Sequence, residues 1–364
     1  MTHDAERPAR TPRTDPVAVR LRWLAEEAPG AAWAQVFWNG WPGWSGWLGE
    51  RAGGEADLAR AERALRRHMP EFVPIWERLV AVVGGDVRAA CFLTFWSPPR
   101  YLMHCAQAVV VDEDGPCLIR NYDLDPRLLE GVLFRTAWGS RPVIGMVDGL
   151  AGLSDGMNAA GLAVSLAFGG RAAHGQGFGV PLILRYVLQM CRDVQDGVEA
   201  LRALPCHMAY NLTLVDASGA HATVLMSPDR PALVLADRFA TNHQLGVEWP
   251  WHGRLSQSAE RFSALAAAMG DGPVTATSLL HRFLSPPLHS TRYGEGFGTL
   301  FTALYRPAQG RMELHWPGLP PTRQSFADFR EGSRELVFTH GRLAEEPPRP
   351  HHPSHSFGAA HSAA

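Results

Sequence analysis

Hydrophobic residues in the middle of the chain recur in short strand-like runs that are separated by turn signals. Such runs, joined by a few residues that include glycine, are typical of β-hairpins. The predicted hairpins span residues 109–121, 211–226 and 299–316, with turns at Gly115, Gly219 and Gly310, and single strands are predicted at 143–147 and 161–168. The pattern therefore predicts a sheet built from neighbouring antiparallel strands.

Other stretches carry apolar residues three and four positions apart, which is the helical spacing. The predicted helices span residues 56–69, 181–204, 258–269 and 275–284. Pro181 stands where proline is favoured, at the first position of its helix. Hairpins that follow one another and are separated by helices favour an α+β fold, with helices covering antiparallel sheet, over alternating βαβ units.

The first hundred residues differ from the rest, and we predict that they are helical. Five tryptophans lie between residues 33 and 47, and this much apolar area must pack on the rest of the chain. The two ends are rich in proline and polar residues, which predicts disorder. The expected organisation is a disordered tail at 1–17, a helical Trp-rich segment at 18–104, a core at 105–345 and a disordered tail at 346–364.

The overall composition is that of a globular protein, with 46% hydrophobic residues and a formal net charge of −2 in 364 residues. The balanced charge gives no basic face for nucleic acid. No run approaches the ~20 apolar residues of a membrane helix, and the N-terminus lacks the apolar segment of a signal peptide. We therefore expect a cytoplasmic protein that binds neither nucleic acid nor membrane.

The chain contains no lysine, so all 34 of its Lys and Arg residues are arginine. This excludes a Walker-type phosphate loop, a Schiff-base or pyridoxal-phosphate lysine, a Ser–Lys hydrolase and a protein kinase. The five cysteines are scattered and form no CxxC pair, so neither a structural zinc site nor a disulfide framework is indicated. We expect no cofactor and no metal.

Residues 152–156 match the GxSxG pattern around Ser154. In serine hydrolases that pattern needs a strand before the serine and a helix directly after it. Here residues 156–161 predict a turn that leads into a strand. A turn is therefore the favoured interpretation, and a serine hydrolase that uses Ser154 is kept as an alternative.

The most informative stretch begins at Cys105. The predicted hairpin returns the chain so that Arg120 and Asp123 lie beside Cys105, because antiparallel strands are ~5 Å apart. A cation next to a thiol lowers its pKa and favours the thiolate, and a carboxylate can hold an amine or a water. A buried cysteine beside an Arg–Asp ion pair is the alternative explanation.

This stretch, a cysteine followed by a glycine hairpin and then Arg-Asn-x-Asp at 120–123, resembles the N-terminal-nucleophile (Ntn) hydrolases. It is most similar to the isopenicillin-N acyltransferase-like autoproteolytic cysteine family, and more distantly to acid ceramidase, N-acylethanolamine amidase and choloylglycine hydrolase. Four further segments resemble motifs of the family in the same order, at 155–162, 241–243, 258–262 and 298–316. The likeness extends over residues 70–340.

The resemblance implies a four-layer αββα sandwich and a precursor that is cut between His104 and Cys105. Residues 1–104 would then form a small chain that stays associated with the large chain 105–364. The tryptophans give a physical reason for this association, since their apolar area must remain covered.

The resemblance also implies a mechanism. Cleavage frees the α-amine of Cys105, whose pKa of ~7.7–8.0 suits a general base for the thiol of the same residue. Cys105 would attack an amide or thioester carbonyl, and Asn242 would donate to the oxyanion. Arg120 would stabilise the thiolate, Asp123 would accept from the amine, and Arg261 would support this cluster. Transfer of the acyl group to water gives hydrolysis, and transfer to an amine gives acyl transfer.

The expected partner is a small N-acylated substrate, with an acyl-CoA among the acyl donors that the resemblance allows. The sequence shows no substrate-binding motif. A catalytically silent Ntn-fold binding or scaffold protein is the alternative from another functional class. Individual residues also have alternatives: Asn242 as a turn asparagine, Arg254 in place of Arg261, and Asn211 as a hydrogen-bonded core residue or a second polar residue of the site.

Overall fold

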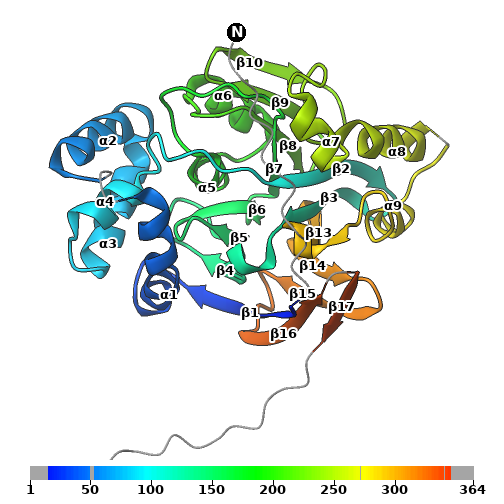
Figure 1. The fold of residues 1–364 in the computed structure, drawn as a ribbon, viewed down its shortest axis with the longest axis horizontal. Helices are drawn as coiled ribbons and strands as arrows, with labels where there is room; N and C mark the ends of the chain where they lie inside the picture. The colour runs from blue at the N-terminus through cyan, green and yellow to red at the C-terminus, as the bar shows by residue number, and fades with distance from the viewer. Residues whose placement is uncertain (1–14, 50–52, 271, 340, 346–364) are drawn as a thin grey trace, which may run out of the picture.

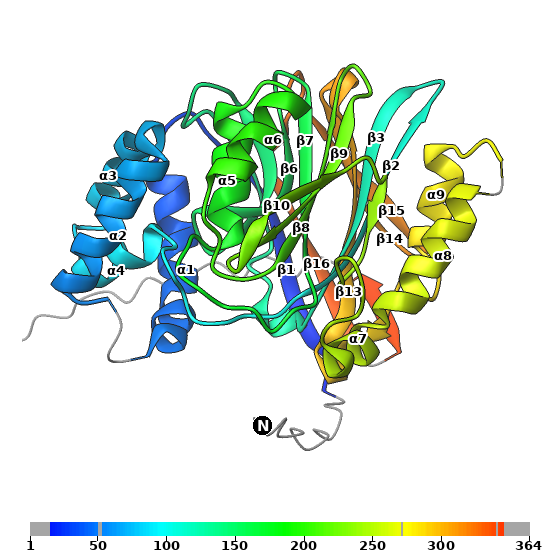
Figure 2. The ribbon, with the colours of Figure 1, turned by 90° about the horizontal axis from the view of Figure 1, so that it is seen from above.

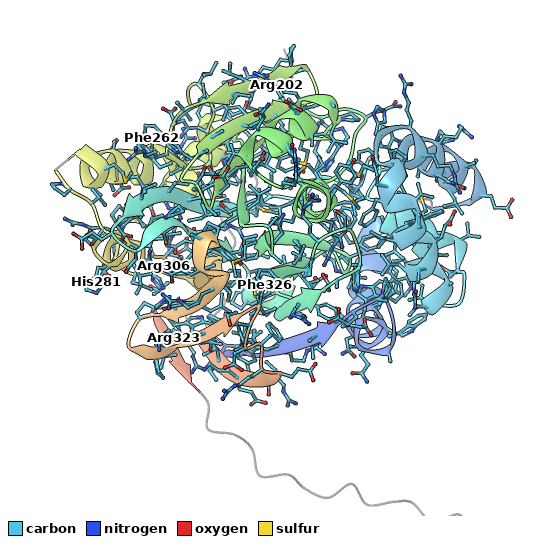
Figure 3. All side chains as sticks on the ribbon, turned by 180° about the vertical axis from the view of Figure 1, so that it is seen from behind. Arg202, Phe262, His281, Arg306, Arg323 and Phe326 are labelled. Carbon is cyan, nitrogen blue, oxygen red and sulfur yellow. The ribbon has the colours of Figure 1, made fainter. Side chains whose placement is uncertain are left out.

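Two β-sheets lie face to face and carry helices on both outer sides (Figure 1, Figure 2). The computed structural model describes residues 15–49, 53–270, 272–339 and 341–345. Helices α5 and α6 cover the larger sheet, and α8 and α9 cover the smaller one, where Phe262 on α8 and His281 on α9 are labelled in Figure 3. The predicted α+β class and the four-layer αββα order are confirmed.

The larger sheet has ten strands in the order β10-β9-β8-β7-β6-β5-β4-β1-β16-β17. Neighbouring strands are antiparallel except β1 and β4, which are parallel. The bounds are β1 Val17–Glu26, β4 Val132–Thr136, β5 Val143–Asp148, β6 Gly152–Asn158, β7 Leu162–Phe168, β8 Tyr210–Asp216, β9 His221–Ser227, β10 Arg230–Leu235, β16 Gly332–Thr339 and β17 Arg342–Glu345.

The smaller sheet has the order β11-β2-β3-β13-β14-β15, with β12 paired to β13. Its bounds are β2 His104–Asp112, β3 Gly115–Leu124, β11 Phe239–Ala240, β12 Thr291–Arg292, β13 Phe297–Arg306, β14 Arg311–Trp316 and β15 Leu319–Ser325. Alternate residues of β2 and β3 enter two different cores, because successive side chains of a strand point to opposite faces. One core lies between the sheets, and the other lies under α8 and α9.

The helices form two outer layers and one additional group. Helices α1–α4 gather at one end of the molecule, on the same side as α5 (Figure 1, Figure 2). The bounds are α1 Ala31–Leu48, α2 Glu55–His68, α3 Val73–Val82, α4 Val87–Leu93, α5 Val180–Met190, α6 Val194–Ala203, α7 Pro250–Ser256, α8 Ser258–Gly270 and α9 Ala276–Phe283.

The predicted hairpins are confirmed as β2–β3, β8–β9 and β13–β14. Their turns contain Gly115, Gly219 and Gly310, each with a positive φ that favours glycine. The helix predicted over 181–204 is instead two helices, α5 and α6. The chain breaks between them, and the Asp193 side chain caps α6 by accepting a hydrogen bond from the Asp196 backbone N–H.

The segment predicted to be helical at 18–104 begins with a strand, so this part of the prediction is wrong. In β1, the buried residues Val19, Leu21 and Trp23 alternate with more exposed residues such as Arg20. This period of two is the pattern of a strand with one buried face. β1 pairs with β4 and β16, and so lies inside the larger sheet. The tail predicted at 346–364 and residues 1–14 lie outside the described residues.

Ser154 lies within strand β6 and not in a turn, which corrects the prediction for this motif. A second strand follows β6, so the helix that a nucleophile elbow needs is absent from residues 152–168. The two glycines of the motif have a packing role. A Cβ on Gly152 would clash with Pro181, and one on Gly156 would lie 2.9 Å from Leu188 Cδ1, so both glycines let α5 approach the sheet.

The tryptophans of α1 pack as predicted, with one exception. Trp33 is fully buried and donates from Nε1 to the Leu150 carbonyl at 3.0 Å. Three more are partly buried against the core, at Trp41, Trp44 and Trp47. Trp38 is 52% exposed and lies outside this packing.

Candidate active site

Cys105 is the second residue of β2 and is completely buried. Its cross-strand partner on β3 is Tyr122, and both side chains enter the core between the two sheets. Burial raises the pKa of the Cys105 thiol to about 11, and the nearby Arg120 guanidinium opposes this shift. Arg120 therefore lowers the thiol pKa as expected, but in the uncut chain desolvation raises this pKa by more.

Arg120 connects the thiol to the opposite sheet. Its Nη2 donates to Cys105 Sγ at 3.1 Å, and its Nη1 forms an ion pair with Asp155 on β6. The Asp155 carboxylate also accepts hydrogen bonds from Tyr305 and from Ser154 Oγ, the latter at 2.9 Å. Arg120 and Asp155 are both fully buried, so each depends on the other to compensate its charge.

Asp155 is the residue of this cluster that the sequence prediction misses. Because it follows Ser154 in the GxSxG pattern, the sequence places it in a turn motif. Its partner Arg120 is thirty-five positions away in the sequence, and the two meet only when the sheets pack together. The available signal is a carboxylate within a run of apolar and small residues.

Asp123 lies on the other face of β3 from Arg120. The two positions differ by an odd number, so their side chains point to opposite sides of the strand. Asp123 forms an ion pair with Arg261 of α8 at 2.6 Å and accepts from Thr299 Oγ1 at 2.7 Å. Burial raises the pKa of the Asp123 carboxyl, and the Arg261 guanidinium opposes this shift. Arg254, the alternative to Arg261, is exposed on α7.

Asn242 meets the backbone of Cys105. The Cys105 N–H donates to Asn242 Oδ1 at 3.0 Å, and Asn242 Nδ2 donates to the Phe168 carbonyl at 3.1 Å. Asn211 holds the segment on both sides of Asn242, because its Nδ2 donates to the carbonyls of Thr241 and His243, each at 2.8 Å. Asn211 is thus a hydrogen-bonded core residue, and it fixes the position of Asn242.

His104, the residue before Cys105, is almost fully buried on the opposite face of β2. Its ring stacks on Phe297 with the centroids 4.2 Å apart and meets the His252 ring edge-on at 4.8 Å. Burial holds the pKa of His104 well below its usual value, so the ring is neutral. These contacts fix the backbone on the N-terminal side of Cys105.

The described part of the chain holds no group of three or more His, Cys, Asp or Glu residues arranged to bind a metal ion. Among the helices at 31–283, none is both long enough and apolar enough to cross a membrane.

Several solved structures are distantly similar to this chain. A mutant of conjugated bile acid hydrolase from Clostridium perfringens matches with a TM-score of 0.44 and 13% identity over 63% of this chain and 96% of its own. Penicillin V acylase from Agrobacterium tumefaciens gives 0.43 and 14% identity over 64% and 90%. The Caenorhabditis elegans ortholog of N-acylethanolamine-hydrolyzing acid amidase gives 0.39 and 16% identity over 56% and 93%.

No curated protein matches the chain. The family model for acyl-coenzyme A:6-aminopenicillanic acid acyl-transferase matches residues 110–319. The matched stretch begins after Cys105 and contains Arg120, Asp123, Asn242 and Arg261. Because the match covers more than half of the 364 residues, the chain belongs to the acyl-coenzyme A:6-aminopenicillanic acid acyl-transferase family.

Proposed function

We propose that this protein is a self-processing cysteine amidohydrolase or acyltransferase. The chain cuts itself between His104 and Cys105, and Cys105 then attacks an amide or thioester carbonyl of a small N-acyl compound. The acyl group passes to water or to an amine, and acyl-CoA is one thioester donor of the required chemistry.

One observation carries this proposal: Cys105 has a polar partner at both of its reactive positions. Arg120 Nη2 lies 3.1 Å from the sulfur, and Asn242 Oδ1 lies 3.0 Å from the backbone nitrogen that cleavage would turn into an α-amine. A structural cysteine does not need a cation at its sulfur, because a buried thiol packs as a small apolar group.

Self-cleavage proceeds through a thioester. The Cys105 sulfur adds to the His104 carbonyl carbon, the C–N bond between the two residues breaks, and the nitrogen keeps its pair and gains a proton. Water then hydrolyses the thioester, which leaves a carboxylate on His104 and a free thiol and α-amine on Cys105. The stacking of His104 on Phe297 supports this step, because it holds the carbonyl side of the bond in place.

The free α-amine then supplies the base that the uncut chain lacks. Its pKa of ~7.7–8.0 lets it take the thiol proton near neutral pH. The ammonium that results stays next to the sulfur and joins Arg120 in stabilising the thiolate. Asn242 Oδ1 already faces this nitrogen. Asp123, which is paired with Arg261, lies directly across the strands from His104.

The same groups serve the acyl-transfer step. The Asn242 amide carries two hydrogens, and the hydrogen bond to Phe168 uses one of them. The other is free to donate to the oxyanion of the tetrahedral intermediate, a contact worth about 3 kcal/mol in other enzymes. Water or an amine then attacks the acyl-enzyme and regenerates the thiol.

Two other functions make different demands. A serine hydrolase would need Ser154 as a free nucleophile, yet its hydroxyl is buried and donates to Asp155. A silent binding or scaffold protein would keep the fold without needing a cation at the Cys105 sulfur.

The intact mass of the purified protein under denaturing conditions tests the proposal. We expect two species that correspond to residues 1–104 and 105–364, and one uncut species of 39.8 kDa for Cys105→Ala. Cys117→Ala is the matched control, because Cys117 is a buried cysteine of the same hairpin whose side chain enters the core under α8 and α9. This variant should be cut like the wild type.

Turnover of a panel of N-acyl amides gives the second readout. Cys105→Ala should abolish it, and Ser154→Ala should retain it. A natively folded wild-type chain that stays whole for days and releases no amine would refute the proposal in favour of the silent protein.

A further inference from the structure

A cavity of about 560 Å³ lies beside the hairpin that carries Cys105. It lies between helix α1, the segment that precedes Cys105, and the chain that follows strands β3 and β5. Trp44 and Trp47 of α1 and Tyr122 of β3 are aromatic parts of its wall. Cavities of this volume hold small organic ligands in proteins.

The cavity reaches the neighbourhood of the candidate nucleophile. Tyr122 is the direct cross-strand partner of Cys105, and Met103 is two residues before it; both line the cavity. Directly opposed side chains on paired strands start about 5 Å apart. The cavity therefore reaches the direct strand neighbour of Cys105, while the buried thiol itself is not part of the lining.

Two carboxyl groups from different segments also line this cavity, the partly buried Glu130 and the buried Asp148. Glu130 Oε1 accepts from Trp44 Nε1 at 2.7 Å and from the Leu150 N–H at 2.9 Å, whereas its Oε2 is buried and has no hydrogen-bond partner among the described residues. Asp148 is 9% exposed and accepts from the Tyr122 hydroxyl at 3.3 Å. Buried acceptors without partners are rare in proteins and mark a place where a donor belongs.

The arginines near the cavity act on these carboxyl groups only at longer range, Arg22 on Glu130 and Arg120 on Asp148. Arg22 is half-buried, and Arg100 and Arg127 are exposed, so these arginines remain accessible to water. Arg127 is paired with Asp125. Within the described ranges, no ion pair joins an arginine to Glu130 or Asp148. The most buried charged group of the lining is therefore the acidic Asp148, and Arg100 and Arg127 belong to its exposed part.

We propose that this cavity binds the substrate of Cys105, and that Glu130 and Asp148 bind a protonated amine of that substrate. The claim that the ligand is a substrate rests on the proposed function, whereas the claim that the ligand carries an amine rests on the cavity alone. An ammonium group supplies the donors that Glu130 Oε2 lacks, and the aromatic rings of Trp44 and Trp47 in the wall favour a cation further. The substrate class is thus a small N-acyl compound that carries a second, positively charged amine.

The raised pKa values of Glu130 and Asp148 agree with the lack of an ion-paired cation at these carboxyl groups. Burial raises the pKa of Glu130 to about 8, with Asp148 adding to the shift, and burial raises the pKa of Asp148 to about 6. A bound ammonium favours the ionised carboxylates, so amine affinity should rise with pH between 6 and 8.

Binding to the uncut Cys105→Ala chain tests the cavity independently of catalysis. The probes are hexylammonium, hexanol and hexanoate, which share one alkyl chain and differ in charge, titrated by ligand-observed NMR. We expect hexylammonium to bind at least about tenfold more tightly than either of the others. Its affinity should fall by about the same factor in Glu130→Gln and in Asp148→Asn.

Glu113→Gln is the matched control, since Glu113 is an exposed acid in the turn between β2 and β3 and its loss changes the net charge equally. This variant should bind hexylammonium as before. Equal or tighter binding of hexanoate, or unchanged amine binding when Glu130 and Asp148 are both replaced, would overturn the inference. The comparison of the three probes needs no variant of the cavity, so it is decisive even where such a variant unfolds.

The two proposals fail in different ways. A chain that binds hexylammonium selectively but is never cut loses the proposed function and keeps an amine site. A chain that is cut at Cys105 but prefers hexanol or hexanoate keeps its function, and the assignment of the amine is then wrong.

Discussion

At the scale of single residues, the site consists of two buried Arg–Asp pairs on opposite faces of β3. Arg120 pairs with Asp155 between the sheets, and Asp123 pairs with Arg261 under α8. The sequence alone suggests one cluster, with Arg120 and Asp123 both beside Cys105. The strand periodicity separates them, and each then needs a partner from another element. Removal of one member of such a pair leaves an uncompensated buried charge.

Asp155→Ala should therefore lower the free energy of unfolding by about 3–5 kcal/mol, the usual cost of breaking a buried ion pair. Urea unfolding followed by tryptophan fluorescence measures this change. Asp155→Asn should cost less, because the amide oxygen still accepts from Tyr305 or Ser154. Asp328→Ala breaks the exposed pair with Arg330 and should cost under about 1 kcal/mol. An Asp155→Ala variant as stable as Asp328→Ala would refute this account of Arg120.

At the scale of elements, β1 joins the two parts of the chain. It belongs to the residues before Cys105, yet its hydrogen-bonding neighbours β4 and β16 both follow Cys105. Trp33 adds a buried contact between α1 and the end of β5, through the carbonyl of Leu150. A cut before Cys105 therefore leaves a sheet in which one inner strand comes from the smaller piece.

We expect the two pieces to remain together after the cut, because loss of β1 would expose two strand edges at once. Native size-exclusion chromatography should show both in a single peak, and the same sample should separate into two species in denaturant. A chain that lacks residues 1–26 should aggregate or fail to fold. Release of a folded large piece under native conditions would contradict this expectation.

The success of the sequence-based predictions depends on how local each element is. The hairpins can be predicted because their turns carry glycines that a positive φ requires, at Gly115, Gly219 and Gly310. β1 is not predicted because the tryptophan-rich helix that follows it gives the stronger sequence signal. The residues Val19, Leu21 and Trp23 nevertheless alternate with more exposed residues, as in a strand. Its parallel pairing with β4 depends on contacts across a hundred residues, which no local pattern encodes.

The same distinction holds for the candidate site. The link between Cys105 and Arg120 follows from one hairpin and could be predicted from its length. The links from Arg120 to Asp155 and from the Cys105 backbone to Asn242 connect different elements and need the sheets to pack. Glu130 and Asp148 carry no motif, because they become neighbours only when the chain after β3 and the end of β5 meet at one cavity.

At the scale of the whole molecule, buried titratable groups make stability depend on pH in two opposite ways. His207, His252 and His289 are buried, and desolvation lowers the pKa of each to about 4. Their contribution to stability is complete above their unfolded pKa of about 6.5 and is lost as the pH falls through 4. Glu130 and Asp148 act oppositely: their contribution is lost as the pH rises through about 8 and about 6.

These two sets predict a stability maximum near neutral pH. Below pH 6, the three histidines and the buried His104 bind protons on unfolding, while Glu130, Asp148 and Asp123 release them. The proton uptake by the histidines is the larger effect, so the free energy of unfolding falls as the pH falls. Above pH 7, Glu130 ionises in the folded protein, and towards pH 9 the five cysteines, whose thiol pKa values burial raises to about 11 or about 12, ionise in the unfolded chain, so stability declines. Urea unfolding at intervals between pH 4.5 and 9 measures both limbs.

His252→Phe should flatten the acid limb, because it removes one of these histidines and keeps a ring against Phe168 and Trp249. Each histidine contributes at most a few kcal/mol between pH 6.5 and 4, at about 1.4 kcal/mol per pKa unit. His281→Gln changes an exposed histidine of α9 and should leave the limb unchanged. If His252→Phe loses stability in acid as steeply as the wild type and His281→Gln, the buried histidines do not cause the acid limb, and the ionisation of the carboxyl groups must be reconsidered.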